Sequence, residues 1–442
     1  MYFIRLSCLT CLLFVITLIS GAVSSAQQPS IDLPLAEQYF QEAQAICRED
    51  DGALWGVSLC GPLMFVERGT RMIVANQSDA ESSLVKKGGV FVGRLPETET
   101  IANTATRWAG VKWTMVMWPL PANKQIRATL MMHELYHRIQ DDIGLPASNP
   151  PNNHLDTRDG RLWLQLEWRA LRRALETDGA ESRKAIEDAL IFRRYRRSLF
   201  PDSHSTERGL EMNEGLAEYT GLKLRGSPNP ESVAYLVKQL ETAESKQTFV
   251  RSFAYASGPV YGFLLDGSKS GWRRGLRPSD DLGELVQRHY SIKLPSNLKA
   301  EAEKRSAKYG GNSLSASETE RDIKRQKRVA EHRARFIDGP ILVLPLTGKV
   351  SYGFDPNNVE SLDSLGTVYP TLRVTDAWGI LDVTRGALMI LGVPGVSRVQ
   401  VPAPADTSKR KVEGDGWTLE LGEGWNLVPG ARKGDYSIKK RE

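Results

Sequence analysis

Hydrophobic positions change their spacing along the chain, and each change predicts a different kind of element. Between residues 27 and 50 apolar side chains recur every three or four positions, which predicts a leading amphipathic helix. Between about 50 and 120, short apolar runs alternate with turn residues, a pattern typical of strands. These runs lie at 62–66, 72–75, 90–92 and 111–118. The pattern predicts a small mixed or antiparallel sheet after the leading helix.

The helical period returns after Pro119 and persists to about residue 270. Its first stretch begins near Lys124 and ends near Asp142, where Gly144 follows as a stop signal. Further helices are predicted at about 160–177, 180–198, 205–222, 231–250 and 253–266. This part of the chain is therefore expected to be mainly helical.

The last third of the chain has a different character. Residues 301–338 are polar and charged, which predicts a helical linker. From 339 to 442, β-like segments alternate with Gly, Pro, Asp and Asn turns and predict an all-β domain, either a sandwich or a small barrel. The expected fold class is α+β. A domain at 27–300, with its sheet at about 50–120 and its helices at about 124–270, precedes the β domain.

The first 26 residues are typical of an export signal. Arg5 precedes an apolar run from Leu9 to Ile19, and small residues at 24–26 form a cleavage site. The alternative is a membrane anchor, but the run is short for a span. We expect cleavage, no stable membrane span afterwards, and a secreted or periplasmic protein.

Export also bears on the cysteines and the partners. Two of the four cysteines lie in the signal, and Cys47 with Cys60 is expected to form a disulfide, two buried thiols being the alternative. A net charge of +5 is modest, and the arginine cluster at 193–197 is typical of a solvated helix face. Nucleic acid is not an expected partner of an exported chain, and the pattern predicts no particular oligomeric state.

The strongest chemical motif lies at 133–137, which reads His-Glu-Leu-Tyr-His on a predicted helix. Residues four apart share one helix face, so the imidazoles of His133 and His137 can bind one ion. Glu134 lies about 100° around the helix axis, beside the ion, where a base takes a proton from water. A chain of this length builds its core without a metal. The ion is therefore expected to be functional.

A catalytic zinc site needs a third protein ligand and one open position. The strongest candidate segment is 211–219, Glu-Met-Asn-Glu-Gly-Leu-Ala-Glu-Tyr. Glu211, Glu214 and Glu218 share one face of the predicted helix, and carboxylates so placed destabilise a helix unless a cation faces them. A solvated acidic face is one alternative, and His154 as the third ligand is another.

The two motifs together resemble the gluzincin metallopeptidases, such as the thermolysin-like and aminopeptidase branches. The resemblance implies a zincin-like catalytic domain with one Zn²⁺ per chain and Glu214 as the third ligand. Asn213 and Glu218 would support the ligands, Glu218 by orienting a histidine. It also implies a peptidase acting on a peptide or protein substrate, with Glu134 as general base.

Residues 255–258, Tyr-Ala-Ser-Gly, extend the resemblance. They are similar to the Tyr-x-x-Gly stretch of aminopeptidase-type members, which implies that Tyr255 stabilises the oxyanion, with Tyr261 as second choice. The segment between the two metal motifs is longer than in compact members and predicts an inserted helical hairpin. The strand at 113–118 lacks the substrate-amine motif of aminopeptidases, so endo- and exo-action both stay open. That strand is expected to pair with extended peptide.

Two other functions compete with a peptidase. The first is a non-catalytic zinc-containing envelope protein that binds peptide or polysaccharide through its β domain. The second is a scaffold with a vestigial site that holds no zinc. Chelator-sensitive peptide hydrolysis separates the peptidase from both alternatives.

Overall fold

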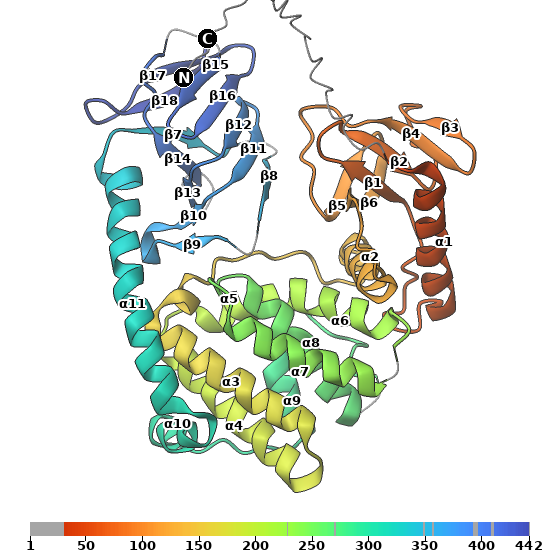
Figure 1. The fold of residues 1–442 in the computed structure, drawn as a ribbon, viewed down its shortest axis with the longest axis vertical. Helices are drawn as coiled ribbons and strands as arrows, with labels where there is room; N and C mark the ends of the chain where they lie inside the picture. Colours follow the sequence, from red (N-terminus) through yellow and green to blue (C-terminus); the bar gives the residue numbers. More distant parts are fainter. Residues whose placement is uncertain are drawn as a thin grey trace, which may run out of the picture.

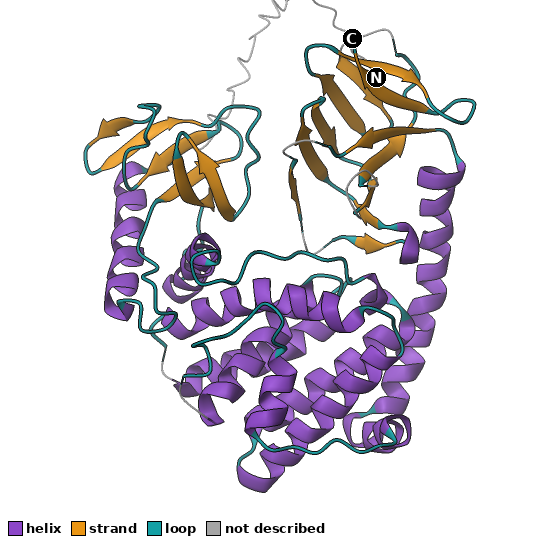
Figure 2. Cartoon of the chain, turned by 180° about the vertical axis from the view of Figure 1, so that it is seen from behind, coloured by secondary structure: helices purple, strands orange, loops and turns teal. Residues whose placement is uncertain are grey.

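The computed structural model describes seven stretches of the chain, and the expected export signal at 1–26 lies outside them. The described residues are 31–227, 229–268, 271–347, 350–355, 358–391, 397–407 and 411–441. They form an α+β fold in which a small sheet and a β domain stand side by side above a layer of helices (Figure 1, Figure 2). Within these stretches, no helix combines the length and apolar character of a membrane span.

A leading helix and a mixed sheet form the first part of the fold. The helix α1 begins after Asp32, whose side chain caps it by accepting a hydrogen bond from the Leu35 amide. The sheet has the order β3-β4-β2-β1-β6-β5, with β1 antiparallel to β2 and parallel to β6. The elements are α1 (Leu33–Asp50), β1 (Leu63–Glu67), β2 (Met72–Ala75), β3 (Val85–Lys87), β4 (Val90–Arg94), β5 (Thr104–Trp108) and β6 (Val111–Trp118). The sheet is therefore of the mixed kind.

The two edge strands, β3 and β5, are not predicted by the hydrophobic pattern because they are short and largely polar. Their presence corrects one expectation. The strand at 113–118 belongs to β6, which pairs with β1 on one side and β5 on the other, so it has no free edge for a peptide. The free edge on this side of the sheet belongs to β5.

A disulfide ties the leading helix to the sheet. Cys47 near the end of α1 is bonded to Cys60 in the loop before β1. Cys47 is fully buried among apolar residues of α1 and the sheet, so the bond lies at the edge of the N-terminal core.

The helical layer carries the expected hairpin between the two metal motifs. α3 and α4 are joined by a two-residue turn and pack closely against each other. The ligand segment forms α5, a π-helical turn named η2, and α6, while α9 is a helix that the pattern does not predict. The bounds are α2 (Lys124–Ile139), α3 (Arg158–Glu176), α4 (Gly179–Ser198), α5 (Ser203–Leu210), η2 (Glu211–Gly215), α6 (Leu216–Leu224), α7 (Asn229–Glu244), α8 (Ser252–Ser268), α9 (Leu282–His289), α10 (Leu298–Ser306) and α11 (Gly311–Arg333).

The predicted linker at 301–338 is helical, but it does not run free through solvent. The helix α11 packs along α3 and leads up to the β domain (Figure 1). Its Glu318 is buried and accepts hydrogen bonds from Arg161 at 3.1 Å and from Gln165 at 2.7 Å. α11 is therefore part of the helical layer and fixes where the β domain begins.

The C-terminal domain consists of two sheets around a shared apolar core. The orders are β17-β18-β7-β14-β13-β10-β9 and β15-β16-β12-β11-β8. The strands are β7 (Ile341–Pro345), β8 (Ser351–Phe354), β9 (Glu360–Ser361), β10 (Thr367–Tyr369), β11 (Leu372–Asp376), β12 (Gly379–Val383), β13 (Ala387–Ile390), β14 (Arg398–Pro402), β15 (Lys411–Gly414), β16 (Trp417–Leu421), β17 (Trp425–Pro429) and β18 (Tyr436–Lys440). This arrangement is the sandwich rather than the barrel.

The arginines of α4 correct the expectation of a solvated helix face. Arg193, Arg196 and Arg197 are buried, and Arg196 has no exposed surface at all. Four carboxylates, on α3, α5, η2 and just before α9, meet these guanidinium groups in one buried charge cluster. They are Glu167, Glu207, Glu211 and Asp281. Because buried charges must be paired, this cluster fixes α4 relative to the four elements that bring the carboxylates.

We expect the substitution Arg196→Met to lower the free energy of unfolding by about 3–5 kcal/mol, because the buried carboxylates of Glu167 and Glu207 each lose one of their two guanidinium partners. Urea unfolding followed by circular dichroism measures the change. Arg194→Met is the matched control, since the Arg194 side chain is half exposed and pairs with Glu284 at the longer distance of 3.6 Å. The control should change stability by less than about 1 kcal/mol. Equal effects of the two variants would contradict the structural role of the cluster.

Candidate metal centre

The helix α2 presents both motif histidines on the face that packs against α6. Asn123 caps its first turn by accepting a hydrogen bond from the Ile126 amide at 3.0 Å. The helix then packs against β6 and α6, so His133 and His137 lie one turn apart in the interior. Their Nε2 atoms are 3.1 Å apart. The two imidazoles therefore converge on one point.

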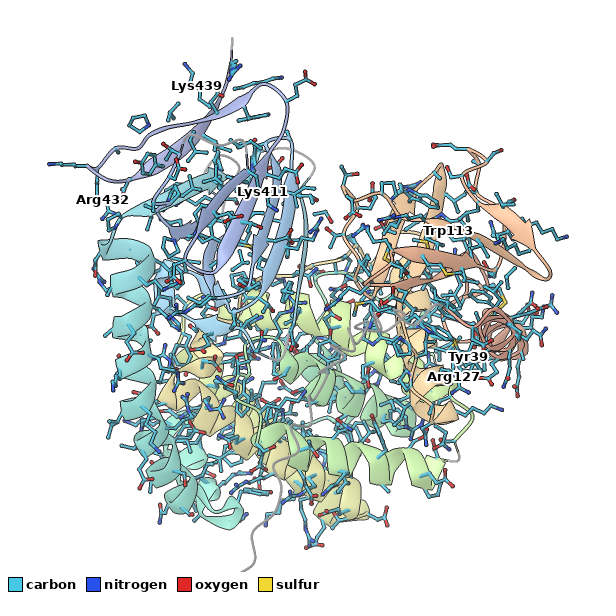
Figure 3. The ribbon with its side chains drawn as sticks, turned by 45° about the horizontal axis from the view of Figure 1, so that its top comes forward. Tyr39, Trp113, Arg127, Lys411, Arg432 and Lys439 are labelled. Carbon is cyan, nitrogen blue, oxygen red and sulfur yellow. A yellow bond between two sulfur atoms is a disulfide. The ribbon has the colours of Figure 1, made fainter. Side chains whose placement is uncertain are left out.

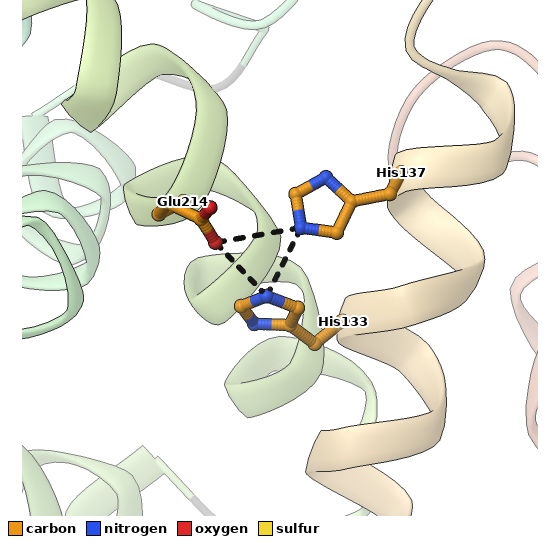
Figure 4. A group of neighbouring side chains, drawn as sticks. All are labelled: His133, His137 and Glu214. Carbon is orange, nitrogen blue, oxygen red and sulfur yellow. Dashed lines mark hydrogen bonds and ion pairs between the residues drawn. The ribbon is translucent and has the colours of Figure 1, made fainter. Parts of the chain in front are cut away.

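Glu214 reaches the same point from the π-helical turn η2 (Figure 4). Its Oε2 atom lies 3.5 Å from Nε2 of His133 and 3.5 Å from Nε2 of His137. Two ligands of a tetrahedral zinc ion, each about 2.0–2.1 Å from the metal, lie about 3.3 Å from each other. The three donor atoms thus have the spacing of one face of a tetrahedral site, with the fourth position left for water or substrate.

The outer nitrogens of the two rings determine where their lone pairs point. Nδ1 of His133 lies 3.1 Å from Oε2 of Glu218, and Nδ1 of His137 lies 2.6 Å from Oε1 of Gln140. These oxygens accept hydrogen bonds, so each Nδ1 carries the proton. In the neutral rings both Nε2 lone pairs then face each other and Glu214, an arrangement that a cation between them stabilises.

The electrostatics of the triad agree with this geometry. Burial by itself lowers the pKa of His133, but hydrogen bonds with Glu214 and Glu218 outweigh it and raise that pKa to about 10. Burial likewise opposes ionisation of Glu214, yet the two imidazoles and Arg251 hold its pKa well below the usual range. Both shifts show that the site favours a positive charge between the two rings and the carboxylate.

Glu134 lies beside the triad, and one of its two carboxylate oxygens is left without a partner in the described part of the chain. The side chain is only 5% exposed, and its Oε2 atom has no hydrogen-bond partner among the described residues. Burial raises the pKa of Glu134, while the neighbouring histidines oppose the rise. A buried carboxylate oxygen without a protein partner is suited to hold a water molecule, and here that water would stand next to the ion.

Tyr255 comes from α8 and touches two members of the triad. Its hydroxyl donates a hydrogen bond to Oε2 of Glu214 at 2.6 Å, and its ring stacks on that of His133. Two glycines explain this proximity, because a Cβ atom on Gly215 would lie 2.9 Å from Cα of Gly258. The glycine that follows Tyr255 in the Tyr-x-x-Gly stretch therefore lets α8 approach the turn that carries Glu214.

Three residues singled out from the sequence lie elsewhere. Tyr261 donates to Glu167 at 2.7 Å, and Nε2 of His154 lies 2.9 Å from Glu207, so both contact the buried charge cluster. Glu211 pairs with Arg193 in that cluster. The expectation that Glu211 shares a face with Glu214 assumes an α-helix, whereas the wider π turn shifts the phase and points Glu211 away from the histidines.

Asn213 is placed to hold Glu214. The sequence analysis missed two further residues of the site, namely Arg251, which also holds Glu214, and Gln140, which holds His137. The amide of Asn213 donates to Asn149 at 3.0 Å and to Oε1 of Glu214 at 3.3 Å. Arg251 donates to the same glutamate oxygen at 3.0 Å. Gln140 could have been found from the sequence, because it lies three residues after His137 and therefore on the same side of the helix. Arg251 could not, because only the tertiary fold brings it to Glu214.

The triad opens into a cleft of about 740 Å³. Its walls come from β5 with the loop before it, from α2 and α8, and from β8 of the C-terminal domain. The cleft therefore lies where all three parts of the fold meet, and His133, His137 and Glu214 are among the residues that line it.

Comparison with known proteins adds no relative to this picture. No protein-family model, no curated protein and no solved structure matches the chain. What the centre does must therefore be inferred from the chemistry and geometry of its own residues.

Proposed function

We propose that this chain is a zinc-dependent peptidase of the gluzincin type, with His133, His137 and Glu214 as the ligands of one ion per chain. The observation that carries the proposal is the buried convergence of these three donor atoms at 3.1–3.5 Å. Two imidazoles and a carboxylate are the ligand set of catalytic zinc in hydrolases. The expected export signal and the disulfide favour action outside the cytoplasm.

Zinc bound at the triad would supply a Lewis acid that activates water and polarises the carbonyl to be cleaved. Glu134 accepts the proton of the attacking water, since its buried Oε2 atom has no hydrogen-bond partner among the described residues. It then delivers this proton to the leaving amine. The raised pKa of Glu134 favours the uptake of the proton. Tyr255 offers a hydroxyl donor beside the same point, suited to the oxyanion that forms.

Catalysis is favoured over a purely structural zinc site by two features. A structural site is closed by four protein ligands, whereas three potential ligands converge here within the described residues. The three ligands line the cleft, and so does Glu134. A non-catalytic protein that binds peptide or polysaccharide through its β domain stays the alternative, and the following experiment separates the two.

We expect Glu134→Gln to keep one zinc per chain and to lower kcat on casein or a peptide library by about 10²–10⁴-fold, because the base is lost and the ligands are not. Elemental analysis measures the metal, and mass spectrometry of the digest measures turnover. The control is wild-type protein treated with chelator and then restored with zinc. Substantial activity in Glu134→Gln would contradict the role of this residue. Zinc without any chelator-sensitive activity in the wild type would establish the non-catalytic alternative.

We expect Gln140→Leu to weaken zinc affinity by about 10–100-fold, because His137 loses the acceptor that fixes its ring and tautomer. Competition with a chromophoric chelator measures the affinity. Gln125→Leu is the matched control, since Gln125 is exposed near the start of the same helix. An unchanged affinity in Gln140→Leu would rule out this positioning role.

A further inference from the structure

Two strand edges line the cleft above the metal triad, and they belong to different domains. β5 is an edge strand of the N-terminal sheet, and β8 is an edge strand of the five-stranded sheet of the C-terminal domain. Within the described residues, β5 pairs with β6 alone and β8 with β11 alone. Residues of both strands line the same cleft as His133 and Glu214. Each edge strand has a row of main-chain groups that no neighbouring strand pairs.

Direct contacts fix the position of β8 relative to the N-terminal sheet. Gly353 in β8 lies so close to the loop before β5 that a Cβ atom there would stand 2.9 Å from the methyl group of Thr100. Nearby, Arg373 of β11 donates to the carbonyl of Glu97 at 3.0 Å. The two domains flank the same side of the helical layer (Figure 3). β8 is therefore seated as a wall of the cleft.

The side chains of β8 connect this wall to the metal ligands. Tyr352 and Phe354, two residues apart on one face of the strand, are half-buried, and their rings are 5.9 Å apart. The Phe354 ring also lies 5.4 Å from the guanidinium carbon of Arg251. Arg251 in turn is paired with Glu214. One arginine therefore separates an aromatic surface of the C-terminal domain from the third ligand.

We propose that the C-terminal β domain is part of the substrate site. The cleft binds one polypeptide segment in extended conformation between β5 and β8. Tyr352 and Phe354 contact an apolar side chain of that segment close to the bond that is cleaved. Strand edges recognise extended main chain, and aromatic rings beside them select side chains. This inference rests on the proposed peptidase function and names its substrate class: unfolded or flexible polypeptide with apolar residues, rather than a folded surface.

Binding can be tested separately from hydrolysis in the Glu134→Gln background. The probe is reduced, carboxymethylated casein carrying a fluorescent label, and anisotropy gives the dissociation constant. We expect adding Phe354→Ala to weaken binding by about tenfold, with Tyr352→Ala as a second variant should the first fail to fold. Trp425→Ala is the matched control, because Trp425 is a half-buried aromatic residue of the same domain outside the cleft. It should leave binding unchanged.

Selectivity is measured on active protein with a peptide library. Wild type should prefer apolar residues next to the cleaved bond, and Phe354→Ala should reduce that preference while zinc content stays the same. Unchanged binding and selectivity in well-folded Phe354→Ala and Tyr352→Ala would overturn the inference. A folded protein that binds as tightly as the casein probe would overturn it as well. Casein binding that depends on Phe354, without any hydrolysis by the wild type, would contradict the peptidase function but support the role of β8 in binding polypeptide. Hydrolysis that is unchanged in Phe354→Ala and Tyr352→Ala would support the peptidase function but contradict the role of β8.

Discussion

The structure depends on one electrostatic arrangement: two imidazoles and a carboxylate that face one another in the interior, each oriented from behind. Glu218 and Gln140 hold the rings so that their lone pairs converge. Such a set is poorly stable by itself, because three acceptors cannot satisfy one another. A cation at their centre, or a proton in its place, is what makes the arrangement favourable. The neighbouring elements therefore serve to keep the three metal-binding atoms close together.

Small residues make this closeness possible. The helix that follows Glu214 is bordered by α8 on one side and by α2 on another, and a glycine stands at each contact. Gly215 faces Gly258 of α8, and a Cβ atom on Gly221 would lie 2.5 Å from the carbonyl oxygen of Thr129 in α2. Larger side chains at these contacts would push the helices apart by more than a ligand distance can tolerate, since zinc ligands hold to about ±0.2 Å.

The parts of the site that could be predicted from the sequence are those whose geometry is local. His133, Glu134 and His137 lie within two turns of one helix, so their spacing fixes their relation. Features set by tertiary structure carry no such signal. A π turn separated Glu211 from the neighbouring glutamates. Burial of the α4 arginines depends on carboxylates from four elements, so their sequence looks like an ordinary solvated face. The edge strands β5 and β8 are short and half exposed, and a hydrophobic pattern does not reveal them.

The π turn η2 carries two glutamates whose negative charges are balanced in different ways. Glu211 meets the guanidinium groups of Arg193 and Arg197, which are covalently part of the chain and cannot leave. Glu214 is held by Arg251 on its Oε1 atom, but its Oε2 atom faces the two imidazoles, which are uncharged when their outer nitrogens alone carry protons. Glu211 is thus paired with permanent cations, while one oxygen of Glu214 is kept for an exchangeable cation. A rigid anchor beside an open ligand is what a site needs to hold its geometry before the ion arrives.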